Sequence, residues 1–213
     1  MAQTAERTLS PRRTELVAAA ARLFSESGYH GTSMKHLADS LGMLKGSLYA
    51  HIGSKEELLY DVVAEGAERF LTRAHAAAEL EASASERLDA FLVGHIETAI
   101  EHLDAATVFL NEWRYLSDEL RADVQAKRDA YEGLIRGIVT DGISSGEFRA
   151  DADVAMTARL VLSAGNWVYA WYRPEGSLSS TEIGHRYTEM IVRGLKNDSI
   201  KNPADAGDTE VAQ

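Results

Sequence analysis

The chain has 213 residues, of which 45% are hydrophobic and 26% are charged; this balance is typical of a soluble globular protein and excludes disorder throughout. The absence of cysteine excludes disulfides and thiolate metal sites, and the lack of a long uncharged apolar run or a secretion signal favours a cytoplasmic protein with no membrane partner. The net charge is −11, but residues 1–55 carry seven basic and four acidic side chains, so this end has a net charge of +3 and favours contact with a polyanion.

Two helices are predicted at the start of the chain. Ser10 is a favoured N-cap and Pro11 a favoured first helical residue, and the apolar residues that follow recur at helical spacing up to Gly28. A second helix of about two turns is expected to begin near Ser33 and to end at Gly42.

A third short helix is expected after Gly42, with one apolar side and one polar side. The apolar side is expected to consist of three residues at intervals of four: Leu44, Leu48 and Ile52. The opposite side then faces outward with polar side chains. Ser54, followed three residues later by Glu57, predicts a capping box at the start of a long fourth helix.

The rest of the chain predicts longer helices, because its apolar residues recur every three or four positions, and no alternating run predicts a strand. The expected helical spans are 88–103, 108–116, 120–146, 153–171 and 183–195. Asp151 or Asp153 is expected to cap the fourth of these spans, and residues 173–176 are expected to form a turn.

Two short helices joined by a glycine-containing turn, the second with a polar outer face, match the geometry that places a helix in the major groove of DNA. Lys45 can donate to guanine, Ser47 can donate to several base edges, and Gly46 permits close approach. Lys45, Lys55 and hydroxyl groups are expected to contact phosphates. The complete set of expected DNA contacts is Thr32, Ser33, Lys45, Gly46, Ser47, Tyr49, His51 and Lys55.

The same segment carries a family resemblance. Residues 16–58 resemble the N-terminal domain of the TetR family of transcriptional regulators, with matching residues at fixed spacing. The matches include Phe24, Gly28, Tyr29, Thr32, Ser33, Met34, Leu37, Ala38, Gly42, residues 45–49, His51 and residues 54–58. Leu44, Ala50 and Ile52 depart from the family's pattern, and Leu44 stands where many members have a serine or threonine that caps the helix and contacts a phosphate.

The resemblance implies an all-α, Ω-shaped homodimer. Each subunit is expected to have an N-terminal three-helix helix-turn-helix DNA-binding domain and a larger C-terminal helical ligand-binding and dimerisation domain. The last two helices are expected to pair across the two-fold axis, and the middle helices to hold an inducer. The expected organisation is a flexible N-terminal arm at residues 1–11, the DNA-binding domain at 12–58, the ligand-binding and dimerisation domain at 59–196, and a disordered tail at 197–213.

The C-terminal part resembles the subgroup of the family that controls the breakdown of fatty acids, aromatic acids and steroid side chains and responds to acyl-coenzyme A (acyl-CoA) thioesters. Residues 111–114 and 166–179 carry this resemblance. A thioester combines an apolar chain with a polyanionic nucleotide, so an aromatic cleft with arginines at its mouth would suit it. The expected ligand contacts are Phe109, Trp113, Arg114, Asn166, Trp167 and Tyr169, and the candidates for phosphate contacts are Arg114, Arg121, Arg128 and Arg159.

We interpret the protein as a DNA-binding repressor of a catabolic operon that binds a pseudo-palindromic, double-stranded operator as a homodimer and is released by a small hydrophobic or acyl-CoA effector. Another hydrophobic ligand and activation instead of repression stay open, and Trp167 and Trp171 could equally lie at the dimer interface. A further alternative is an all-helical acyl-processing enzyme with His95 or His102 as base. No nucleophile motif, metal set or phosphate loop supports that alternative, so no catalytic residue, metal or cofactor is expected.

Overall fold

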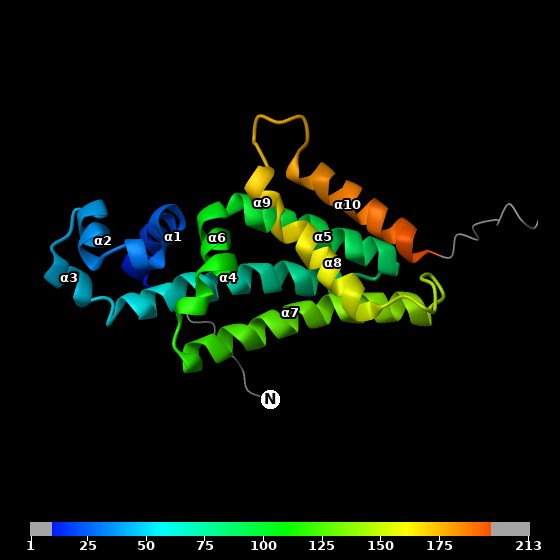
Figure 1. Cartoon of the computed structure of the whole chain (residues 1–213), viewed down its shortest axis with the longest axis horizontal. Helices are drawn as coiled ribbons and strands as arrows, with labels where there is room; N and C mark the ends of the chain where they lie inside the picture. Colours follow the sequence, from blue (N-terminus) through cyan, green and yellow to red (C-terminus); the bar gives the residue numbers. More distant parts are fainter. Residues whose placement is uncertain (1–9, 197–213) are drawn as a thin grey trace, which may run out of the picture.

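The structure is a computed structural model that describes residues 10–196, and all of its elements are helices (Figure 1). The elements are α1 (Pro11–Gly31), α2 (Met34–Ser40), α3 (Lys45–Tyr49), α4 (Lys55–Ala78), α5 (Ala84–Glu101), α6 (Leu103–Asn111), the 3-10 helix η1 (Trp113–Tyr115), α7 (Asp118–Ser144), α8 (Val154–Asn166), α9 (Val168–Trp171) and α10 (Ser180–Leu195). Within this range no strand occurs, as the all-α class requires, and no helix is long and apolar enough to cross a membrane. The expected disordered tail at 197–213 and nearly all of the expected arm at 1–11 lie outside the described residues.

The first helices begin and end at polar caps and a glycine, as expected. The Oγ atom of Ser10 accepts a hydrogen bond from the backbone N–H of Arg13 at 3.4 Å and so caps α1. Gly28 has a φ angle of +72°, which interrupts the helical path before the last residues of α1. Ser33 caps α2 in the same way, by accepting from the backbone N–H of His36 at 3.1 Å.

The start of α4 departs from the expected capping box in one half. The Oγ atom of Ser54 accepts from the backbone N–H of Glu57 at 2.9 Å, as expected. The Glu57 carboxylate, however, accepts from the backbone N–H of Gly53 at 2.8 Å and from the guanidinium of Arg13 at 2.5 Å. Arg13 also donates from Nε to the buried carboxylate of Asp61 at 2.7 Å. These ion pairs fasten α1 to α4.

One apolar core unites α1, α2, α3 and the first half of α4. Phe24, Leu37, Leu48 and Leu59 are each at most 2% exposed. The same core continues into the C-terminal part through Val108, Leu116 and Val124. Helix α4 also runs without a break through the expected domain boundary between residues 58 and 59. The unit expected to bind DNA, α1 to α3 with the start of α4 (the DNA-binding unit), therefore shares a helix and a core with the C-terminal part.

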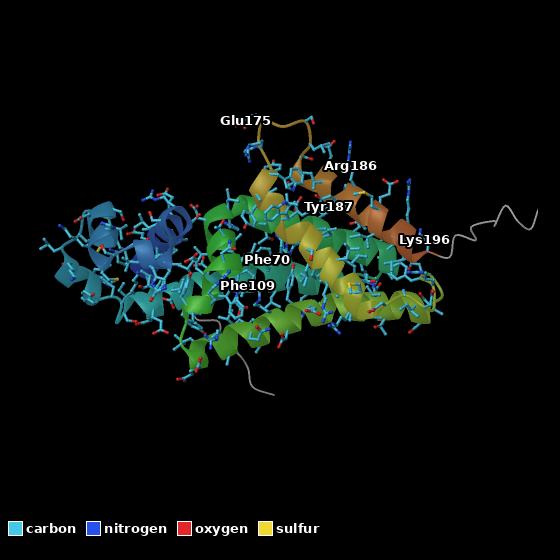
Figure 2. All side chains as sticks on the ribbon, viewed as in Figure 1. Phe70, Phe109, Glu175, Arg186, Tyr187 and Lys196 are labelled. Carbon is cyan, nitrogen blue, oxygen red and sulfur yellow. The ribbon has the colours of Figure 1, made fainter. Side chains whose placement is uncertain are left out.

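A second apolar core lies among α4, α5, α7, α8 and α10. The phenyl rings of Phe70 and Phe109 stack in it with centroids 5.6 Å apart (Figure 2). Helix α10 packs along α5, and α8 packs against α7 (Figure 1). Helices α1, α2 and α3 lie at one end of the long axis of the molecule, and α8 and α10 lie away from them (Figure 1).

Three expected boundaries in this part are wrong. The helix expected over 88–103 ends at Glu101, because His102 has φ −127° and ψ 47°, outside the helical region; Leu103 then begins α6. The helix expected over 108–116 therefore begins at Leu103 and is followed by η1. The helix expected over 153–171 divides at Trp167, where the chain turns and returns Val168 to the core with 0% exposure.

The other expected helices are present, with ends shifted by up to four residues. Helix α7 ends at Ser144, just before the expected stop at Gly146, which has a φ angle of +78°. Asp153 is the cap of α8, since its Oδ1 accepts from the backbone N–H of Met156 at 2.9 Å. The expected turn closes through a hydrogen bond from the backbone N–H of Gly176 to the carbonyl of Arg173 at 2.9 Å.

Candidate functional site

The outer face of α3 is polar and open. Leu48 and Ile52 are 0% and 2% exposed and hold the helix to the core. The exposed residues of the helix are Lys45, Gly46, Ser47 and Tyr49. Nothing lies within 4 Å of the position that a Cβ atom would take on Gly46, so the backbone here can be approached closely. A short helix with this outer face, seated on two others, can enter a major groove.

Leu44 does not lie on the buried side of α3, where its spacing places it; its side chain is 80% exposed. Leu44 is the N-cap of the helix, with φ −71° and ψ 141°, so its backbone is extended and the helical relation to Leu48 does not apply. It makes no side-chain cap hydrogen bond. An exposed apolar side chain therefore precedes Lys45 at the edge of α3.

Two of the hydroxyl groups expected to bind phosphates, those of Thr32 and Ser33, differ in whether they can still donate a hydrogen bond. Ser33 is exposed, and because its Oγ accepts from a backbone N–H it keeps its hydroxyl proton for another partner. Thr32 is 3% exposed, and its Oγ1 lies 3.0 Å from the carbonyl oxygens of both Leu23 and Gly28, to which it donates. Thr32 therefore secures the end of α1 and is not retained among the phosphate contacts.

The two lysines expected at the DNA are both close to tyrosine rings. Nζ of Lys55 lies 4.1 Å from the ring centroid of Tyr29, a cation–π contact, and burial lowers the pKa of Lys55. Nζ of Lys45 lies 6.0 Å from the ring centroid of Tyr49, and the Lys45 side chain is exposed. His51 is exposed as well. The structure thus leaves all the expected DNA contacts except Thr32 at the surface or partly exposed.

The segment from Glu112 to Ser117, which includes η1, contacts the DNA-binding unit directly. Oε2 of Glu112 accepts from the backbone N–H of Tyr29 at 2.7 Å. The ring of Tyr115 stacks on that of Tyr29 at 6.0 Å between centroids with an interplanar angle of 15°. The backbone N–H of Ser117 donates to Oε1 of Glu56 at 2.6 Å. The sequence contains no local signal for these contacts, because their partners are far apart in the chain.

The structure brings part of the expected effector contacts together. Phe109 and Trp113 are half-buried and flank Arg128, whose Cζ atom lies 5.2 and 5.0 Å from their ring centroids. The hydroxyl of Tyr169 accepts from Nδ2 of Asn111 at 3.3 Å. These residues link α6, η1, α7 and α9.

The remaining expected effector contacts are more dispersed. Trp167 is 65% exposed, and its ring lies 6.5 Å from that of Tyr169. Arg114 is exposed and donates from Nε to the carbonyl of Asn111 at 2.7 Å. Asn166 is half-buried at the end of α8.

The two histidines considered as bases occupy different surroundings. His95 is 4% exposed, and its Nδ1 lies 2.8 Å from the hydroxyl oxygen of Tyr131. Burial lowers the pKa of His95 to about 4, so the ring is neutral at pH 7. His102 lies at the corner between α5 and α6, where its Nε2 is 3.0 Å from Nη1 of Arg69. His95 is therefore a core residue.

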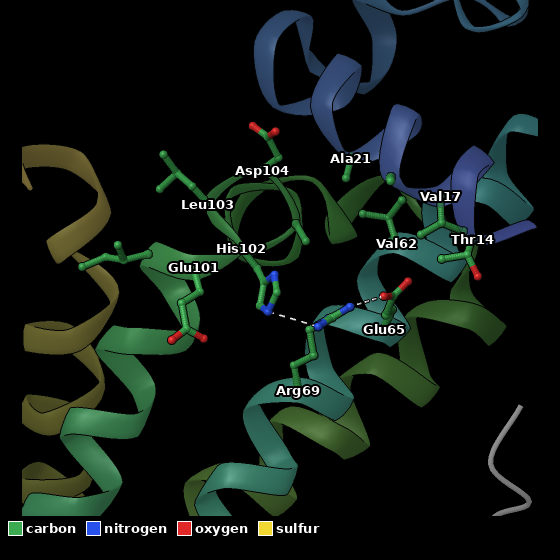
Figure 3. A pocket seen from close by; sticks show the side chains of 13 residues that line it. Thr14, Val17, Ala21, Val62, Glu65, Arg69, Glu101, His102, Leu103 and Asp104 are labelled. Carbon is green, nitrogen blue, oxygen red and sulfur yellow. Dashed lines mark hydrogen bonds and ion pairs between the residues drawn. The ribbon is translucent and has the colours of Figure 1, made fainter. Parts of the chain in front are cut away.

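A cavity of about 480 Å³ lies between α1, α4 and the corner between α5 and α6 (Figure 3). Apolar residues such as Val17 and Val62 line it together with charged ones. Arg69 lies between Glu65 and His102 and donates to Glu65 Oε1 at 2.5 Å (Figure 3). None of the expected effector contacts lines this cavity. It lies at the joint between the DNA-binding unit and the C-terminal part.

Large apolar side chains are exposed along α8, α9 and α10. They are Met156, Leu160, Trp167, Trp171 and Met190, with exposures between 40% and 65%. Helices α8 and α10 pack against each other, so these exposed side chains lie on neighbouring elements. An apolar area of this kind indicates an interaction surface.

Comparison with known proteins identifies the two parts of the chain. The bacterial regulatory proteins of the tetR family match residues 16–62, and the tetracyclin repressor-like C-terminal domain matches residues 81–195. The HTH-type transcriptional repressor KstR2 of Mycolicibacterium smegmatis is 32% identical over 187 residues, which are 86% of this chain and 90% of the relative.

Solved structures agree over nearly the whole chain. The ketosteroid transcriptional regulator KstR2 of Mycobacterium tuberculosis has a TM-score of 0.82 at 26% identity, covering 90% of this chain and 98% of that one. AibR in complex with isovaleryl coenzyme A and operator DNA has a TM-score of 0.77 at 28% identity, covering 84% of this chain and 97% of that one. With its open α3 face and both matching domains, this chain is a DNA-binding transcriptional regulator and belongs to the TetR family.

Proposed function

We propose that the protein is a homodimeric repressor of a catabolic operon, that it binds a pseudo-palindromic operator, and that an acyl-CoA thioester releases it. The observation that carries this proposal is the likeness to AibR, whose structure contains both isovaleryl coenzyme A and operator DNA. The likeness extends over 84% of this chain, so it includes the parts proposed to bind each of the two.

Residues 12–58 are the proposed DNA-binding domain. The proposed contacts are Ser33, Lys45, Gly46, Ser47, Tyr49, His51 and Lys55. Ser47 is assigned to base edges because it lies on the outer face of α3, and Ser33 and Lys55 are assigned to phosphates. Lys45, on the same face as Ser47, is assigned to both a base edge and a phosphate. Arg13 is excluded, because the carboxylates of Glu57 and Asp61 already neutralise it.

Residues 59–196 are the proposed ligand-binding and dimerisation domain. A second copy of the chain is the proposed occupant of the exposed apolar face on α8, α9 and α10, because a homodimer of a TetR-family regulator presents two α3 helices to two half-sites. The proposed effector contacts are Phe109, Trp113, Arg114, Asn166, Trp167 and Tyr169, with the half-buried aromatic residues suited to an acyl chain.

Release is proposed to follow from a change in the separation of the two α3 helices. A difference of about 3 kcal/mol in effector binding between the two dimer conformations corresponds to a change of roughly a hundredfold in operator affinity. The contacts of Glu112 and Tyr115 with Tyr29 provide a direct connection between the C-terminal part and the DNA-binding unit.

The test is an electrophoretic mobility shift of the DNA just upstream of the protein's own gene. The assay is repeated with a panel of acyl-CoAs of different chain length, and with CoA alone as the control. We expect a discrete shifted band of the protein–DNA complex. One class of acyl-CoA should dissociate this complex, and CoA alone should not. A complex that no acyl-CoA affects would remove the thioester from the proposal while leaving the DNA-binding function in place.

A further inference from the structure

Arg128 is a half-buried cation held between two aromatic rings. Its guanidinium forms no hydrogen bond and no direct ion pair with any group in residues 10–196, and its Cζ atom lies 5.2 and 5.0 Å from the ring centroids of Phe109 and Trp113.

 The other arginines of α7 are paired: Arg121 with Asp118, and Arg136 with Glu132. The carboxylate next to Arg128 in sequence, Asp129, accepts from the side chain of Gln125 and acts on Arg128 only as a nearby negative charge, which raises the pKa of Arg128 against the larger effect of burial.

The surroundings of Arg128 do not satisfy its five N–H donors. The faces of Phe109 and Trp113 attract the cation, but they accept no conventional hydrogen bond. Burial lowers the pKa of Arg128, which shows that the environment disfavours the charge, although a guanidinium stays protonated at pH 7. A planar fork of donors with no acceptor is suited to an oxyanion.

The two rings that hold Arg128 are joined to the DNA-binding unit. Phe109 is in α6 and Trp113 is in η1. Between and beside them, Glu112 accepts from the backbone N–H of Tyr29, and Tyr115 stacks on the Tyr29 ring. A change in how Arg128 sits against this segment therefore acts on residues that contact the helix-turn-helix.

We propose that Arg128 binds an oxyanion of the effector, and that this contact draws the guanidinium away from Phe109 and Trp113 and so alters the hold of α6 and η1 on Tyr29. The inference rests on the proposed function, because it names the charged group within the same effector site. The oxyanion is a phosphate in an acyl-CoA and a carboxylate in a free acid, and the two are distinguished by the probes below.

The variants are Arg128→Met, which keeps the length and apolar stem of the side chain, and Arg128→Lys, which keeps the charge but not the fork. Arg136→Met is the matched control, because Arg136 lies on the same helix but already has a carboxylate partner, Glu132, and is not among the candidate phosphate contacts. Circular dichroism and the melting temperature establish that each full-length variant is folded. Operator affinity is measured by fluorescence anisotropy with octanoyl-CoA, S-octanoyl-pantetheine, which lacks phosphates, and octanoate.

We expect Arg128→Met to need at least about tenfold more octanoyl-CoA than the wild type for half-release of the operator, and Arg128→Lys to be intermediate. The Arg136→Met control should respond as the wild type does. S-octanoyl-pantetheine should act equally on all four proteins. If the loss in Arg128→Met is instead seen with octanoate, the oxyanion is a carboxylate. Equal responses of Arg128→Met and the wild type to both anionic probes would overturn the proposal.

A second readout separates this inference from the proposed function. Binding of inorganic pyrophosphate to the wild type is followed by tryptophan fluorescence, since Trp113 lies next to Arg128. If no acyl probe releases the operator, the effector class is wrong, but pyrophosphate binding that Arg128→Met loses and Arg136→Met keeps still supports Arg128 as the oxyanion site. In that case, the proposal is rejected if the wild type does not bind pyrophosphate, or if Arg128→Met binds it as the wild type does.

Discussion

Leu44 places an exposed apolar side chain at the edge of the helix that faces DNA. Its 80% exposure is unusual for a leucine, and its neighbours Lys45 and Ser47 are proposed base contacts. The apolar feature of the major groove is the 5-methyl group of thymine. Burying one methyl group contributes about 0.8 kcal/mol, which is about fourfold in affinity per half-site.

We therefore expect Leu44→Ala to lose affinity for the operator by about fourfold per half-site. The measurement is a binding titration against operators in which single thymines are replaced by deoxyuridine. At one position the replacement should weaken the wild type and leave Leu44→Ala unaffected. If every replacement affects both proteins equally, Leu44 reads no thymine.

His95 makes the stability of the protein depend on pH. Its pKa falls from 6.5 in the unfolded chain to about 4 in the folded one, because burial disfavours the charged ring. The unfolded state therefore binds more protons between these values, so stability present above pH 6.5 is lost as the pH falls toward 4. At pH 5 the loss amounts to about 2 kcal/mol relative to pH 7.5.

The measurement is urea unfolding at pH 7.5 and pH 5 for the wild type and His95→Asn. Asparagine can keep the hydrogen bond to Tyr131 but does not titrate. We expect His95→Asn to be less stable at pH 7.5 and to lose about 2 kcal/mol less than the wild type between the two pH values. Identical losses would show that His95 is not the titrating group.

At the scale of elements, the segment formed by α6 and η1 connects the two cores. It contributes Val108 to the core of the DNA-binding unit, and Glu112 accepts from the backbone of Tyr29. We expect Glu112→Ala to reduce the effect of the effector on operator affinity from roughly a hundredfold to less than tenfold, because this hydrogen bond transmits the movement.

The coupling is measured as the operator affinity with and without saturating effector, and effector binding is measured separately by tryptophan fluorescence. Effector binding in the absence of DNA should stay within a factor of about two of the wild type. Glu119→Ala is the control, since Glu119 is exposed at the start of α7 and its side chain has no hydrogen bond or ion pair within residues 10–196. A full response in Glu112→Ala would show that other contacts transmit the signal.

The element scale also shows what the sequence could predict. Polar caps and glycines marked α1, α2 and the start of α4, because a cap is a local interaction between neighbours in the chain. The breaks at His102 and Trp167 were missed, since the spacing of apolar residues continues across them. Leu44 was misplaced for a related reason: i, i+4 spacing has no meaning for a residue that precedes its helix.

The candidate site was predictable to a similar degree. The exposed polar face of α3 followed from the pattern, because a local periodicity determines which side is buried. The bond from Tyr29 to Glu112 and the position of Arg128 between two rings depend on how distant helices pack. Contacts of that kind leave no periodic signal in one sequence.

At the scale of the whole molecule, the proposed dimer depends on the exposed apolar face of α8, α9 and α10. Leu160 is 53% exposed in the single chain, and burial against a second copy would make a charge there unfavourable. We expect Leu160→Glu to sediment as a monomer. It should bind the operator at least about a hundredfold more weakly than the wild type, because a monomer has one α3 helix and a dimer has two.

The control for this variant is Ala126→Glu, an equally charged change at an exposed position of α7. It should sediment as a dimer and bind the operator as the wild type does. Sedimentation velocity at several protein concentrations gives the answer directly. A dimeric Leu160→Glu would move the interface elsewhere on the molecule.

The uneven distribution of charge in the molecule determines how operator affinity depends on salt concentration. The total charge of −11 opposes contact with DNA, so the few exposed cations near α3 must supply the attraction. Each phosphate neutralised by a protein cation contributes about 0.9 to the slope of log affinity against log salt. Since a dimer carries each lysine twice, we expect Lys45→Ala and Lys55→Ala each to reduce the magnitude of the slope by up to about 1.8.

The control is Arg149→Ala, which removes a cation far along the chain from α3. It should weaken neither operator binding nor its dependence on salt. An unchanged slope in both lysine variants would place Lys45 and Lys55 outside the DNA interface, and the α3 face would then need another source of affinity.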